Sequence, residues 1–199
     1  SYAGRSAEEM ARIAEEERAG AVAAAEALRA AGLRVDIVSL GSSPTALHAR
    51  SLAGITEVRA GVYMFGDLFQ AQLGTHPMGD IAVTVLASVI GRKPERGALL
   101  LDAGALALSK DRSTEKAPRD YGFGLGLDLD GAPLPGEPVV TRVHQEHGEL
   151  SGAPMLPVGA KLRIAPNHSC LTAAAYDRYH VVDGAREVVA VWARVNGWS

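Results

Sequence analysis

A change of pattern near residues 75–80 constrains the fold of this chain more than any other feature of its sequence. Before it, helical and strand-like segments alternate, which is the pattern of parallel α/β structure. After it, short β-branched runs are separated by glycine and proline, which is typical of an antiparallel β domain. We therefore predict a partial α/β barrel over 1–76 and a β-rich domain over 77–199, whose last segment is free to return to the barrel.

A long helix is predicted over residues 6–32, because Ser6 and Glu9 form a capping box and alanine is dense through 19–30. The other elements predicted for the first part are strand 35–40, helix 46–52 and strand 57–59. Two parallel strands with one helical face cannot bury both sides of a sheet. The first part is therefore expected to be an incomplete barrel.

The second part is predicted to consist mainly of short strands. Candidate strands are 81–91, 98–102, 161–164, 180–182 and 187–194. Glycines 122, 124 and 126 superficially match a dinucleotide-binding loop, but a turn rather than a helix follows them, so we reject a nucleotide site there.

Composition excludes several classes of function. The net charge of −3 gives no bulk electrostatic reason to bind nucleic acid or anionic lipid, and no apolar run has the length of a membrane span. One cysteine cannot form an internal disulfide and fits a reducing cytoplasm. The first residues lack a signal-peptide pattern and a starting methionine, so a cytoplasmic piece of a longer protein is expected.

His168 and Cys170 are the first candidate site residues. In an extended segment, side chains two positions apart point to the same face, and Ser169 would point away. Imidazole and thiolate are ligands that Zn²⁺ favours, and a catalytic zinc needs few protein ligands. A buried apolar cysteine beside a surface histidine is the alternative, and two ligands alone do not exclude it.

Two loops at predicted strand ends are candidates for binding a phosphate. Residues 41–45, Gly-Ser-Ser-Pro-Thr, offer hydroxyls and amides before a helix, and the glycine of Gly61-Val62 permits close backbone approach. The alternative for the first loop is an ordinary helix cap with Pro44 at the first helical position. Near a later strand end, Glu146 and His147 form a candidate site-lining pair, although the spacing to His144 is not that of a known zinc motif.

Several segments in this order resemble the D-serine dehydratase / D-threonine aldolase group, pyridoxal-phosphate enzymes of the alanine-racemase fold type. The segments are Gly41–Thr45, Glu57–Tyr63 with Asp67, Leu101–Gly104, Ala107–Ser109 with Asp111, Glu146–Gly148, Pro166–Cys170 and Tyr176–Asp177. The resemblance implies the second half of a (β/α)₈ TIM barrel followed by a mainly antiparallel β domain.

The resemblance also implies roles for individual residues. Catalysis would depend on His168 and Cys170, as ligands of Zn²⁺ or another divalent metal such as Mn²⁺, and on His147. The pyridoxal 5'-phosphate cofactor would be bound by Tyr2, Ser42, Ser43, Thr45, Gly61, Val62 and Tyr63.

The implied activity is that of a lyase on D-3-hydroxy amino acids, which converts D-serine to pyruvate and ammonia. Cleavage to glycine and an aldehyde, as by a D-threonine aldolase, is the alternative, and the cysteine at position 170 favours the dehydratase. A non-catalytic pyridoxal-phosphate-binding half-barrel and an unrelated zinc hydrolase are further alternatives. The family's Schiff-base lysine lies in the first barrel half, so that missing half is an expected partner, as is a second copy in a homodimer.

Overall fold

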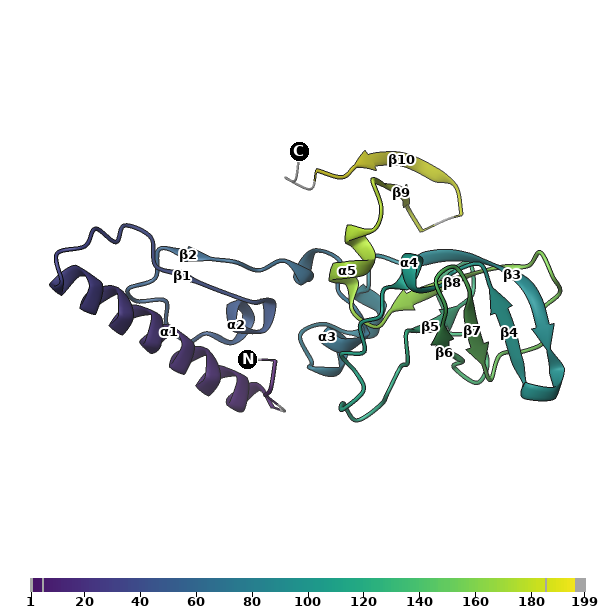
Figure 1. Cartoon of the computed structure of the whole chain (residues 1–199), viewed down its shortest axis with the longest axis horizontal. Helices are drawn as coiled ribbons and strands as arrows, with labels where there is room; N and C mark the ends of the chain where they lie inside the picture. Colours follow the sequence, from purple (N-terminus) through teal and green to yellow (C-terminus); the bar gives the residue numbers. More distant parts are fainter. Residues whose placement is uncertain (1, 5, 185, 196–199) are drawn as a thin grey trace. The chain divides into compact units, whose positions relative to one another are not determined.

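The computed structural model describes residues 2–4, 6–184 and 186–195, which fall into two compact units (Figure 1). The first unit comprises Ser1–Met64 and Gln70–Pro77, and the second comprises Phe65–Phe69 and Met78–Ser199. The segment Phe65–Phe69 therefore belongs to the second unit, although the chain on both sides of it belongs to the first. The functional division between residues 76 and 77 stays a prediction.

The first unit is dominated by α1 (Ala7–Ala30), which confirms the predicted long helix. Ser6 caps it, because its hydroxyl accepts the Glu9 N–H at 3.2 Å and satisfies one of the amides that a helix start leaves unpaired. Met10 and Ala14 are buried on its inner face. Local chemistry is thus sufficient to place this helix.

Two short strands, β1 (Ser39–Leu40) and β2 (Glu57–Val58), pair in parallel beside α2 (Ser43–His48). The strand predicted over 35–40 is shortened to its last two residues, because a ladder extends only as far as its partner strand. The predicted helix 46–52 starts earlier, since Ser42 accepts the Thr45 N–H at 3.2 Å and begins the helix there. The 3₁₀ turn η1 (Val62–Met64) follows β2.

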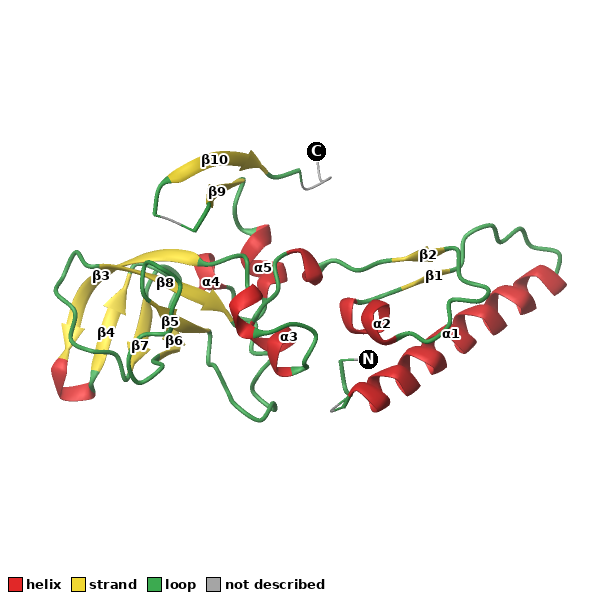
Figure 2. Cartoon of the chain, turned by 180° about the vertical axis from the view of Figure 1, so that it is seen from behind, coloured by secondary structure: helices red, strands yellow, loops and turns green. Residues whose placement is uncertain are grey.

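The second unit is a closed antiparallel barrel with strand order β3-β4-β7-β6-β5-β8 (Figure 2). Its strands are β3 (Val85–Lys93), β4 (Ala98–Leu101), β5 (Gly124–Leu127), β6 (Val139–Val143), β7 (Gly148–Ser151) and β8 (Lys161–Pro166). β8 pairs with both β3 and β5, so the sheet closes and leaves no exposed edge. The predicted antiparallel β domain is confirmed.

Leucine and other apolar side chains fill the barrel interior. The fully buried ones include Leu99, Leu101, Leu150, Leu162 and Ile164. Burial of each such side chain contributes about 1.5–3 kcal/mol, so this interior is the main source of stability of the second unit.

Short helices and a hairpin complete the second unit. They are α4 (Ala105–Leu108), α5 (Ser169–Ala174), the 3₁₀ turns η2 (Met78–Asp80) and η3 (Pro94–Arg96), and the antiparallel pair β9 (Arg178–Val182) and β10 (Val188–Ala193). α3 (Leu68–Gln72) begins in the second unit and ends in the first. Among the described residues, no helix is both long and apolar enough to cross a bilayer.

Candidate functional site

The candidate site of the second unit lies where β8 ends and α5 begins. His168 is the N-cap residue of α5 and has extended backbone angles, while Cys170 lies in the first turn of the helix. Residues 168–170 are therefore not an extended run, so the condition under which the two side chains would share a strand face is not met. The reason is not local: the Ser169 N–H donates to the carboxylate of Asp67 at 2.9 Å, which satisfies a helix-start amide and lets the chain turn.

His168 and Cys170 nevertheless lie close enough for their side chains to interact. Cys170 is exposed and Ser169 is buried, so the alternative of a buried apolar cysteine is wrong. Burial of the imidazole opposes its protonation, but the neighbouring Asp67 and Cys170 side chains outweigh burial and raise the pKa of His168 to about 10.

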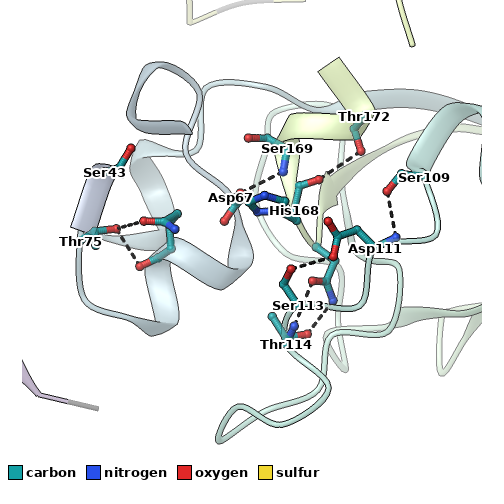
Figure 3. A network of polar contacts seen from close by, with 12 residues as sticks. Ser43, Asp67, Thr75, Ser109, Asp111, Ser113, Thr114, His168, Ser169 and Thr172 are labelled. Carbon is teal, nitrogen blue, oxygen red and sulfur yellow. Dashed lines mark hydrogen bonds and ion pairs between the residues drawn. The ribbon is translucent and has the colours of Figure 1, made fainter. Parts of the chain in front are cut away.

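Asp67 is the residue that sequence reasoning missed as a site residue. Its Oδ2 lies 2.8 Å from Nδ1 of His168, and its side chain is fully buried (Figure 3). A metal-binding histidine commonly donates its second ring N–H to such a carboxylate. The separation of 102 residues between Asp67 and Ser169 left no local signal for this contact.

The segment Phe65–Phe69 fixes Asp67 against the second unit. The Phe69 N–H donates to the backbone oxygen of Asn167 at 3.1 Å, and Leu68 is fully buried against the barrel. The Phe69 ring also meets the imidazole of His168 edge-on, with 6.3 Å between ring centroids. Anchors at the two residues that follow Asp67 therefore hold its carboxylate in place.

Asn167 ties the start of α5 to the loop that follows α4. Its side-chain amide donates to Oγ1 of Thr114 and to the backbone oxygen of Gly122, both at 2.6 Å. Its Oδ1 accepts the Thr114 N–H at 3.1 Å. Both Asn167 and Thr114 are buried, so this amide specifies the path of the loop.

His147 lies in the turn between β6 and β7 and is exposed. Hydrogen bonds connect this turn to α5 through α4: the Ala105 N–H donates to the His144 oxygen at 2.7 Å, and the Thr172 hydroxyl donates to the Leu108 oxygen at 3.1 Å. A side chain at Gly104 would overlap the backbone of His147, so α4 and the turn are closely packed. A catalytic role for His147 stays a prediction.

In the first unit, the two predicted phosphate loops meet. Because β1 and β2 are parallel, both loops follow the same end of the sheet, and the Tyr63 N–H donates to Oγ of Ser43 at 3.0 Å. Ser43 and Val62 are buried, whereas Tyr63 is 67% exposed and Tyr2 is 40% exposed. The structure therefore brings the two candidate loops together.

Two hydroxyls of this loop pair donate to side chains of the first unit. The Ser42 hydroxyl donates to Thr45 at 2.9 Å, and the Thr45 hydroxyl donates to Glu17 at 2.7 Å. Ser43 only accepts in its described bond, so its own proton can serve an anion. A side chain added at Gly61 would meet no atom within 4 Å, so an anion has room there. The loop pair thus fits a phosphate through Ser43 and Gly61, and Ser42 and Thr45 shape the helix start.

The donor set near α5 fits a metal with open coordination positions. Among the residues that the structure describes, no group of three or more His, Cys, Asp or Glu side chains is arranged to hold a metal. His168 and Cys170 would supply one nitrogen and one sulfur, which suits zinc, and the remaining positions are for water, substrate or other segments.

Known families match both units. The family described as "Putative serine dehydratase domain" matches residues 82–182, and the family described as "Alanine racemase, N-terminal domain" matches residues 1–68. D-threo-3-hydroxyaspartate dehydratase of Delftia sp. (strain HT23) is 47% identical over 197 residues, which cover 94% of this chain and 51% of that protein. D-serine dehydratase of Dictyostelium discoideum is 34% identical, covering 81% of this chain and 43% of that protein.

Solved structures agree with these matches. A cysteine-to-alanine variant of D-threo-3-hydroxyaspartate dehydratase, in its metal-free form, covers 99% of this chain and 54% of its own, with 45% identity and a TM-score of 0.86. A second similar structure of that dehydratase replaces a histidine two positions before that cysteine. D-threonine aldolase from Filomicrobium marinum covers 94% of this chain and 48% of its own, with 27% identity and a TM-score of 0.67. The chain spans about half the length of these relatives.

Proposed function

The chain belongs to the serine dehydratase domain family and has an alanine-racemase-like fold, and from this premise we propose that it is part of a pyridoxal-phosphate- and metal-dependent dehydratase of D-3-hydroxy amino acids. The observation that carries this proposal is the placement of His168 and Cys170 together at the start of α5, with the buried carboxylate of Asp67 2.8 Å from the imidazole. The greater identity to the dehydratases than to the aldolase supports elimination over cleavage between Cα and Cβ.

In this proposal the first unit is the second half of a TIM barrel. Another segment supplies the first half, which carries the cofactor lysine. The lysines of this chain are Lys93, Lys110, Lys116 and Lys161. Lys93 is engaged with Glu149 at 2.6 Å on the β barrel, which supports a structural role for it. We use "assembled enzyme" for this chain together with the segment that supplies the lysine.

Residues of the first unit would bind the cofactor, and residues of the second unit would hold the metal and transfer protons. Ser43 and the backbone at Gly61 and Val62 would hold the cofactor phosphate, with Tyr2 and Tyr63 available to line the cofactor. Bound pyridoxal phosphate supplies an electron sink for the carbanion at Cα. His168 and Cys170 would hold a Zn²⁺, or a Mn²⁺, whose Lewis acidity serves the departure of the β-hydroxyl. His147, an exposed imidazole, would carry a proton at the site.

Product analysis on the assembled enzyme tests this proposal. We expect D-serine to yield pyruvate and ammonia, and D-3-hydroxyaspartate to yield oxaloacetate and ammonia. Glycine with an aldehyde from D-threonine would instead establish the aldolase activity. Absence of both cofactor absorbance and product would indicate a non-catalytic protein.

A variant pair tests the metal role separately. His168→Ala should lower kcat by about 10²–10³-fold, the scale of losing one electrostatic contact to developing charge. His180→Ala is the matched control, because His180 is exposed on β9 and should leave kcat unchanged. Full activity of His168→Ala would overturn the metal role.

A further inference from the structure

One carboxylate oxygen of Asp67 serves two partners at the start of α5. Oδ2 lies 2.8 Å from Nδ1 of His168 and accepts the Ser169 N–H at 2.9 Å. The Asp67 side chain is fully buried, and an ionised carboxylate is costly to bury unless donors compensate for the lost water. The His168 ring and the Ser169 N–H compensate the carboxylate for the lost water, so they determine where Asp67 can lie.

The first contact determines which ring nitrogen can bind a metal. Nδ1 of His168 lies 2.8 Å from this oxygen without the alignment of a hydrogen bond, so the contact is an ion pair. A carboxylate has no proton to give, so a proton on Nδ1 is favoured over a lone pair that faces the carboxylate. A metal would then bind Nε2, the other ring nitrogen, by displacing the proton there. The contact between Asp67 and His168 therefore orients the ring and selects its metal-binding nitrogen together.

The second contact determines where Cys170 is placed. His168, the N-cap residue of α5, makes no side-chain capping hydrogen bond, and the Asp67 carboxylate accepts the first helical amide, that of Ser169. Cys170 is the second residue of that helix, so its position depends on where the helix starts. The same oxygen thus positions the imidazole by direct contact with its ring. It positions the Cys170 thiol indirectly, by holding the backbone where the helix begins.

We infer that Asp67 is a positioning residue for the metal pair, holding the Nδ1 proton of His168 and the helix start that presents Cys170. This inference rests on the proposed function for its metal. The segment Phe65–Phe69 would then complete the metal site of the second unit. Its neighbours in the chain belong to the first unit.

The test is zinc affinity of the assembled enzyme, measured by competition with a chelator of known affinity. Asp67→Asn is close to isosteric and keeps an oxygen for the Ser169 N–H, but its amide no longer requires a proton on Nδ1. We expect zinc affinity to fall about 10–100-fold. Asp128→Asn is the matched control, because the Asp128 carboxylate accepts two backbone N–H groups at 2.9 Å without an imidazole, and its zinc affinity should stay unchanged.

A second measurement needs no variant. Histidine-selective ¹⁵N NMR of the zinc-loaded enzyme should show zinc on Nε2 of His168 and a slowly exchanging proton on Nδ1. Zinc on Nδ1, or an Asp67→Asn variant that binds zinc as tightly as the parent, would overturn the inference while leaving the metal site itself intact. If the parent enzyme binds no zinc through His168 and Cys170, the proposed function fails first.

Discussion

Replacing Asn167 with alanine should destabilise the second unit strongly, although Asn167 contacts no substrate in the proposed mechanism. Its side chain makes three hydrogen bonds, two at 2.6 Å and one at 3.1 Å. At about 1 kcal/mol each, their loss costs about 3 kcal/mol, and leaving the buried amide of Thr114 and oxygen of Gly122 unpaired adds up to about 1 kcal/mol each. We therefore expect Asn167→Ala to lower the free energy of unfolding by about 3–5 kcal/mol.

Urea unfolding of the assembled enzyme, followed by circular dichroism, measures this change. Thr141→Ala is the control, because the Thr141 hydroxyl bonds Ser151 at an exposed site and its loss should cost under about 0.5 kcal/mol. A double-mutant cycle between Asn167 and Thr114 should give a coupling of about 0.5–3 kcal/mol. A cost below about 1 kcal/mol for Asn167→Ala would refute the reasoning that this amide fixes the loop.

Three further outcomes follow from the barrel. Leu150→Ala should cost about 2–5 kcal/mol in urea unfolding, because Leu150 is fully buried, whereas Leu86→Ala should cost little at 60% exposure; equal costs would contradict the assigned interior. Gly104→Ala should destabilise the turn between β6 and β7 by steric overlap with its backbone, and an unchanged urea midpoint would contradict that packing. The hydrogen bond from Lys93 lowers the pKa of Glu149, so this stabilisation is present above the ordinary value near 4.5 and is lost as pH falls through the lowered pKa. Glu149→Gln should therefore flatten the loss of stability in acid, and an unchanged pH profile would contradict the pairing.

The features that could be predicted from the sequence are those with local causes. The capping box of Ser6 and Glu9 places α1, and alternation of short apolar runs with glycine and proline predicts the antiparallel strands. The meeting of the two loops near Ser43 and Gly61 follows from a rule about parallel strands, so it too was accessible.

What could not be predicted depends on residues far apart in the chain. The turn into α5 at Ser169 depends on Asp67, and no periodicity connects positions separated by 102 residues. The strand over 35–40 is short because its partner β2 is short, which no property of residues 35–38 reveals. The donation from Thr45 to Glu17 is likewise invisible to a motif that records only hydroxyl residues in a loop.

X-ray absorption of the zinc-loaded assembled enzyme tests the central claim most directly, because it reports the atoms bound to the metal. We expect one sulfur at about 2.3 Å together with nitrogen or oxygen at about 2.0–2.1 Å, and loss of the sulfur shell in Cys170→Ser. Stoichiometric zinc with no sulfur neighbour in the parent enzyme would contradict the assignment of His168 and Cys170 as its ligands.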